Sequence, residues 1–179
     1  MNMIFILSCA AAVMLAGVSG IAIYKLTSGN LDFFEKLCRN RIAGTILGFP
    51  LVCWCVPHAQ AIIFVWAEPY LWYIAVILSV LCYFYLDYLF ARALGGLFII
   101  GAYCFVHWFY EYQITGGAVF SIIAWLWGIG GICISGKPSL LRDFFRRCAV
   151  KKQLKVTSYI FFALTAASFI FSLIAGVAK

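Results

Sequence analysis

Long apolar stretches, separated by short polar gaps, dominate this chain. Six of them contain no charged residue: 1–24, 42–67, 69–86, 93–110, 115–136 and 156–178. About 20 apolar residues in a helix cross a hydrocarbon core of about 30 Å. The pattern therefore predicts six transmembrane helices in a single domain, residues 1–179.

Helices are favoured over strands because backbone groups in lipid must be satisfied within their own segment. No alternation of apolar and polar positions indicates a barrel. The fold class expected is an all-α, polytopic integral membrane protein. The first stretch lacks the basic region that opens a signal peptide, so we expect it to remain as a span.

Composition supports this class. Apolar residues make up 66% of the chain and charged residues 11%, whereas soluble domains carry about 25% charged residues. The net charge of +7 is concentrated in the gaps, which is the mark of cytoplasmic loops rather than of a nucleic-acid-binding face. No nucleic-acid partner is expected.

The basic residues define an orientation. Twelve of the thirteen lie in the gaps after the first, third and fifth stretches: Lys25, Lys36, Arg39, Arg41, Arg92, Lys137, Arg142, Arg146, Arg147, Lys151, Lys152 and Lys155. Positive loops stay in the cytoplasm. Both termini are then expected on the non-cytoplasmic side, in a bacterial inner membrane or an organelle membrane.

Two of the basic gaps have helical periodicity. Apolar residues recur at helical spacing in 30–41 and in 139–148, with charges elsewhere around the turn. Both segments are interpreted as amphipathic helices lying in the interface, where each nearby basic side chain contributes about 1 kcal/mol with anionic headgroups. Two alternatives remain open: the segments are loops that only fix the topology, or they form a docking surface for a soluble cytoplasmic partner. The candidate interfacial residues are Arg39, Arg41, Arg142, Arg146, Arg147, Lys151 and Lys152.

A short Asp-aromatic string recurs in the three basic gaps. It begins at Asp32, Asp87 and Asp143, which are 55 and 56 residues apart. Three helical hairpins of similar length would produce this spacing, and internal repeats of such units are a known way to build membrane folds.

The sharpest chemical pattern is a doubled Cys-x-x-His, Cys55 to His58 and Cys104 to His107, which contains both histidines of the chain. Residues three apart share a helix face. His58 follows Arg41 by 17 residues and His107 follows Arg92 by 15, which places them about 25 and 22 Å along their helices. The two rings are expected to approach each other near the outer leaflet.

Several chemistries fit this pair. A haem b would take one imidazole from each helix, with His58 and His107 as ligands; a Cys2His2 metal site would add Cys55 and Cys104. A quinone or proton-linked site would use one histidine as a donor. Alternatively, the histidines bond to Gln60, Ser121 or a backbone carbonyl and only join helices. On that structural interpretation the protein has no cofactor.

The spans otherwise hold few groups for chemistry. No paired carboxylates or phosphate-binding loop occur in them, and the small residues Gly128, Gly130 and Gly131 indicate close helix packing. The sequence therefore favours a non-catalytic subunit that anchors or scaffolds a larger membrane complex, with lipid and other membrane subunits as its partners. A haem-binding redox subunit is the alternative, and a small transporter is less favoured.

Overall fold

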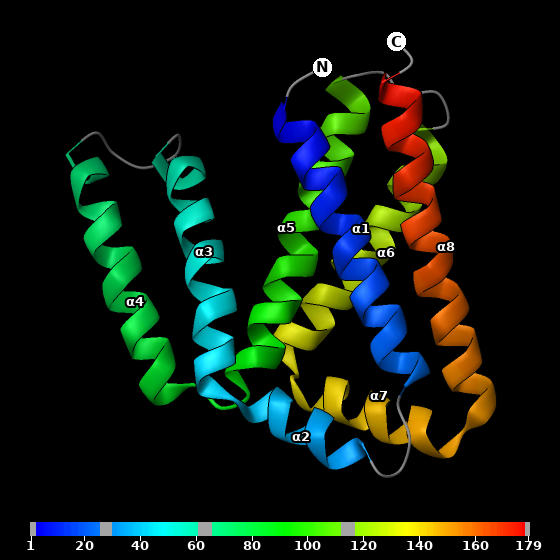
Figure 1. The fold of residues 1–179 in the computed structure, drawn as a ribbon. Coiled ribbons are helices and arrows are strands. Elements are labelled where there is room, and N and C mark those ends of the chain that lie inside the picture. The colour runs from blue at the N-terminus through cyan, green and yellow to red at the C-terminus, as the bar shows by residue number, and fades with distance from the viewer. Residues whose placement is uncertain (1–2, 26–29, 61–65, 112–116, 178–179) are drawn as a thin grey trace.

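The computed structural model describes residues 3–25, 30–60, 66–111 and 117–177. Within these ranges the chain forms helices and no strand, which confirms the all-α class. A short 3-10 turn, η1 (Glu68–Tyr70), leads into α4. The helices shown in Figure 1 are α1 (Met3–Tyr24), α2 (Leu31–Arg39), α3 (Arg41–Gln60), α4 (Leu71–Tyr85), α5 (Leu89–Glu111), α6 (Gly117–Gly136), α7 (Ser139–Val150) and α8 (Lys152–Val177).

Among the residues that the structure describes, four helical segments are long and apolar enough to cross a membrane: Arg41–Gln60, Glu68–Tyr85, Leu89–Glu111 and Lys152–Ile170. A fifth is added if Phe120–Gly136 and Ser139–Val150, which meet at a bend of 110°, count as one span. In α1 the segment Val13–Tyr24 is apolar but shorter than these. The structure therefore supports a membrane protein with four or five such helices, one or two fewer than the sequence predicts.

Two helices begin earlier than the charge-free stretches suggest. α5 starts at Leu89 and not at residue 93, and α8 starts at Lys152 and not at residue 156. The backbone remains helical through Arg92 and Lys155 because arginine and lysine are good helix formers, and Nη1 of Arg92 donates to the carbonyl oxygen of Ser135 in α6. Parts of the second and fifth stretches, 61–65 and 115–116, lie outside the described residues.

The long helices lie side by side, with α5 at the centre of the packing. α5 packs against α6 on one side and α3 on another, α1 packs against α8, and α4 lies on the outer side of α3. In Figure 1, α2 and α7 run across one end of these helices, and the chain termini lie at the other end. The two ends of the fold thus differ, because only one of them is crossed by α2 and α7.

Aromatic rings from α5, α6 and α8 form the largest buried cluster. The Phe105 and Phe169 ring centroids are 4.0 Å apart, and those of Trp127 and Phe169 are 5.6 Å apart in an edge-on arrangement. Edge-to-face and tilted ring pairs add to the packing energy of a core. This cluster holds the face of α5 opposite to α3.

Glycines set the two closest helix crossings. A Cβ atom at Gly131 of α6 would lie 2.6 Å from the carbonyl oxygen of Gly95 of α5, and one at Gly44 of α3 would lie 2.5 Å from the backbone nitrogen of Phe90. Small residues allow helix backbones to approach this closely. The expected close packing is therefore present at Gly131, whereas a Cβ at Gly130 would meet nothing within 4 Å.

Candidate functional site

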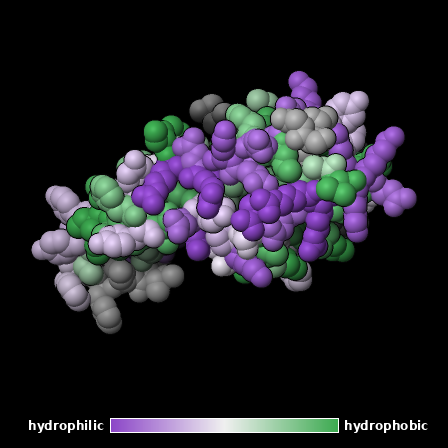
Figure 2. All heavy atoms as spheres, turned by 90° about the horizontal axis from the view of Figure 1, so that it is seen from below, coloured by the Kyte–Doolittle hydropathy of each residue, from purple (hydrophilic) through white to green (hydrophobic). Residues whose placement is uncertain are grey.

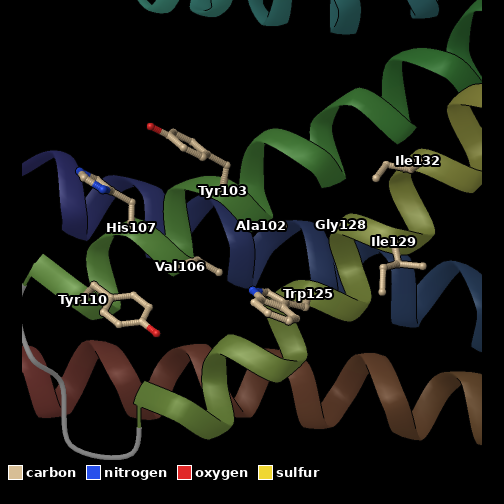
Figure 3. A pocket seen from close by; sticks show the side chains of 9 residues that line it. All are labelled: Ala102, Tyr103, Val106, His107, Tyr110, Trp125, Gly128, Ile129 and Ile132. Carbon is tan, nitrogen blue, oxygen red and sulfur yellow. The ribbon is translucent and has the colours of Figure 1, made fainter.

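The two histidines lie on neighbouring helices, and both pack against Tyr103 of α5. The rings of Tyr103 and His107 are parallel to within 3°, with centroids 6.1 Å apart. The ring of His58 stands edge-on to Tyr103 at 5.7 Å. Figure 3 shows Tyr103 and His107 on adjacent turns of α5. The Cys-x-x-His pattern did not include Tyr103, although its position four residues before His107 places it on the same helix face.

His58 is fixed by its own helix. Its Nδ1 atom lies 3.1 Å from the carbonyl oxygen of Trp54, one turn earlier, and the two rings stack with centroids 6.1 Å apart. A carbonyl oxygen only accepts, so Nδ1 donates and carries the proton in this bond. Nε2 of a neutral His58 is then left with its lone pair, which makes it an acceptor or a ligand.

His107 faces a carboxylate. Its Nε2 atom lies 3.7 Å from Oε2 of Glu111, one turn further along α5, and both side chains are exposed. A protonated imidazole would form an ion pair with this carboxylate. The site therefore includes the negative charge of Glu111, which lies on the same helix as His107.

The cysteines of the motif do not join the histidines. Cys104 is buried with the aromatic cluster, whereas His107 is exposed on the same helix. Residues three apart differ by about 60° around a helix axis, which here is enough to place one inside and one outside. Cys55 is exposed on α3. The described residues contain no group of three or more His, Cys, Asp or Glu side chains that could hold a metal ion.

Tyr103 also bears on haem binding. In a bis-histidine site the porphyrin lies between two imidazoles. Here the ring of Tyr103 lies against both His58 and His107. The structure thus brings both predicted ligands to one place, where a third ring contacts each of them.

A second candidate site lies at the other end of the molecule, where α2 and α7 pack together. Nε and Nη2 of Arg146 donate to the two carboxylate oxygens of Glu35 at 2.5 and 2.9 Å. Next to this pair along each helix, the ring centroids of Phe34 and Phe145 are 5.2 Å apart. We call the joined surface of Leu31–Arg39 and Ser139–Val150, together with the adjoining Lys151 and Lys152, the α2–α7 platform.

The loop before α5 ties the platform to the long helices. Tyr88, at its centre, has a φ of 56°, a conformation that is uncommon outside glycine. Nη1 of Arg142 donates to the Tyr88 hydroxyl at 3.2 Å, and the guanidinium of Arg39 lies 5.2 Å from the ring centroid. Cys38 and Leu141 are buried with Ala91 of α5 underneath. The three Asp-aromatic strings therefore meet at this end of the fold.

Two further arginines bond to the ends of long helices. Nη1 of Arg41 donates to the carbonyl oxygens of Tyr83 and Phe84 at 3.2 and 3.3 Å, in the last turn of α4. Nη1 of Arg92 donates to the carbonyl of Ser135 at 2.8 Å, near the end of α6. The last carbonyls of a helix lack intrahelical donors and carry partial negative charge. These arginines therefore satisfy helix ends as well as supplying positive charge.

The ionisable groups of the platform are shifted by their surroundings. Hydrogen bonding to Arg146 lowers the pKa of Glu35, so that carboxylate is charged over a wider pH range. Burial raises the pKa of the Cys38 thiol to about 11 and raises that of Cys148 as well. Both thiols are neutral and buried at neutral pH, which opposes their acting as nucleophiles or acylation sites.

The candidate interfacial residues fall into two groups. Arg39, Arg41, Arg142 and Arg146 make the internal contacts given above. Arg147, Lys151 and Lys152 are exposed and have no side-chain partner among the described residues. Figure 2, which views the molecule from the platform end, shows hydrophilic side chains gathered over this face.

Comparisons of the chain with protein-family models, with curated protein sequences and with solved structures find no match.

Proposed function

We propose that this protein spans a membrane with six helices, that its α2–α7 platform lies on the cytoplasmic face, and that it serves as a non-enzymatic scaffold of a larger membrane complex. The gathering of basic residues at one end of the helices supports the orientation, because cytoplasmic loops carry the excess of Lys and Arg. The amphipathic sequences of α2 and α7 support their placement in the interface. Both termini then lie on the opposite side.

The observation that carries the scaffold function is the preformed platform. Glu35 and Arg146 join α2 to α7, and Tyr88 joins both to the long helices, so the surface exists before any partner arrives. Exposed Arg147, Lys151 and Lys152 then present positive charge. Such a surface attracts an acidic cytoplasmic protein and anionic headgroups through the same electrostatic mechanism.

A lateral surface for other membrane subunits is provided by α4. Only Leu71 and Ala75 are buried in this helix, and it packs mainly against α3. The rest of α4 presents large apolar side chains outward, among them Trp72, Tyr73, Ile77, Leu81, Phe84 and Tyr85. In a membrane, contiguous apolar surface of this size is covered by lipid or by another helix. In the scaffold that we propose, a helix of a partner subunit packs against this surface.

Charge reversal at the platform tests the scaffold function. In the triple variant R147E/K151E/K152E, we expect the assembly extracted with mild detergent to lose its soluble partner and decrease in mass. The matched control R147K/K151R/K152R keeps the charge and should keep the partner. The unsubstituted protein is also measured. If its assembly has only the mass of this chain with lipid and detergent, the proposal is contradicted.

A redox function is the second candidate, because His58 and His107 converge on one site from α3 and α5, and no side chain or backbone group among the described residues binds Nε2 of His58. It predicts a purified protein with a haem absorption band that is lost in both H58A and H107A. A colourless protein without bound metal would exclude it.

A further inference from the structure

A groove runs along the membrane-facing side of α5 and α6. It has a volume of about 590 Å³ and is lined almost entirely by apolar atoms, with Tyr103 and Tyr110 on α5 and Trp125 and Ile129 on α6 among its walls. Figure 3 shows these side chains on both sides of the space between the two helices. It is an open hollow on the surface of the helix pair and not an enclosed cavity.

The groove follows from how the two helices pack. They touch most closely at Gly95 and Gly131, while their large rings, such as Phe105 and Trp127, point to the opposite side and fill the core. Gly128 adds no side chain to the groove floor, where a Cβ would lie 3.3 Å from that of Ala102. The space is therefore built into the helix pair.

The groove spans much of the bilayer depth. Arg92 and Ser135 are hydrogen-bonded to each other, so they mark one level on α5 and α6. Ile132 lies three residues from this level and Tyr110 lies 18 residues from it, which gives about 5 and 27 Å along the helices. An extended hydrocarbon chain runs in this direction in a bilayer about 30 Å thick.

Charge distinguishes the outer end of the groove. His107 and Tyr110 line it there, and the Glu111 carboxylate is 3.7 Å from His107. Among the described residues, Glu68 and Glu111 are the charged Asp, Glu, Lys or Arg residues at this end, at the start of the turn before α4 and at the end of α5, whereas the basic residues lie at the platform end. An anionic headgroup is disfavoured beside Glu111, and an ammonium group is attracted.

We infer that this groove binds one phospholipid with a zwitterionic, ammonium-bearing headgroup. One hydrocarbon chain lies between α5 and α6, its ester carbonyl or phosphate oxygens accept hydrogen bonds from His107 and Tyr110, and its ammonium pairs with Glu111. Phosphoethanolamine has this headgroup chemistry. The inference rests on α5 and α6 lying in a bilayer and is independent of any partner at the platform.

Lipid retention by the full-length protein tests the inference. The chain is reconstituted into nanodiscs of equal phosphatidylethanolamine and phosphatidylglycerol, extracted with mild detergent, and its bound lipids are counted by native mass spectrometry. We expect one retained phosphatidylethanolamine. I129W, which fills the groove, should reduce its retention about tenfold, a loss of about 1.4 kcal/mol in binding free energy. L126W places the same ring on an exposed part of α6 outside the groove and should retain the lipid.

A second pair of variants tests the headgroup. E111Q should lose most of the preference for phosphatidylethanolamine over phosphatidylglycerol, whereas E68Q, which removes the other acid at this end, should keep it. Three results would overturn the inference: retention of phosphatidylglycerol or a quinone alone, no retained lipid, or equal retention by I129W and L126W. Loss of folding in I129W, checked by circular dichroism, leaves E111Q against E68Q as the deciding comparison. Partner capture at the platform is measured separately, so failure of either proposal can be told from failure of the other.

Discussion

At the scale of single residues, arginine and lysine have different roles at the charged end. Arg41 and Arg92 each reach backbone carbonyls at the ends of neighbouring helices. A planar guanidinium with several donors suits such contacts, whereas the lysine ammonium is a more strongly hydrated point charge. Lys151 and Lys152 are exposed accordingly. Arg41 and Arg92 thus join helices, whereas Lys151 and Lys152, like Arg147, are exposed to their surroundings.

The Glu35–Arg146 pair predicts a pH dependence of stability. The pair lowers the pKa of Glu35 below its ordinary value of 4.5. Its contribution to the free energy of unfolding is therefore complete above that value and is lost as the pH falls through the lowered pKa. The melting temperature in detergent should fall in this acidic range, and less steeply in E35Q, which cannot titrate there.

High salt provides the control for this effect. The carboxylate and the guanidinium are both partly exposed, so added salt should screen their interaction and bring the melting temperatures of wild type and E35Q closer together at neutral pH. Parallel melting curves of the two proteins across the whole acidic range would show that Glu35 does not couple α2 to α7.

The histidine site could be predicted from the sequence only in part. Helical rise alone predicted that His58 and His107 lie at similar depth, and the structure brings both rings to Tyr103. The spacing of the Cys-x-x-His pattern did not show that Cys104 is buried while His107 is exposed. A difference of about 60° around the axis is small on a helical wheel, but it separates the buried and exposed faces of α5 when an aromatic core covers one of them.

At the scale of helices, the sequence predicts where each one lies better than which helices touch. A charge-free stretch is a local property, so the six stretches coincide with helices over most of their length. Contacts depend on which small residues meet across space. Gly128, Gly130 and Gly131 look alike in the sequence, yet only Gly131 lies against the backbone of α5.

This difference predicts opposite effects of two neighbouring substitutions. G131A would place a Cβ 2.6 Å from the carbonyl oxygen of Gly95, so the α5–α6 crossing must open, at a cost of about 1–3 kcal/mol. G130A meets nothing within 4 Å and should be neutral or stabilising by up to about 1 kcal/mol. Unfolding in mixed micelles, followed by circular dichroism, measures both. Equal stability of the two variants would contradict the crossing described for Gly131.

At the scale of the whole molecule, the two ends differ in charge, and that difference is what the basic residues of the sequence predicted. The platform end contains the described Lys and Arg residues, and the opposite end contains Glu68 and Glu111. The union of α2 with α7 could not be predicted, because Glu35 and Arg146 are 111 residues apart and no local pattern selects that pairing. The charge difference is the basis of the orientation that we propose, because loops rich in Lys and Arg stay in the cytoplasm.

Cysteine accessibility measures this orientation directly. E68C and K151C place a thiol on an exposed residue at each end of the molecule, and the wild-type chain reports labelling of the native cysteines. We predict that a membrane-impermeant maleimide labels E68C in intact cells or organelles, and labels K151C only after the membrane is made permeable. Labelling of both variants from the same side, or of K151C alone in intact membranes, would contradict a cytoplasmic α2–α7 platform.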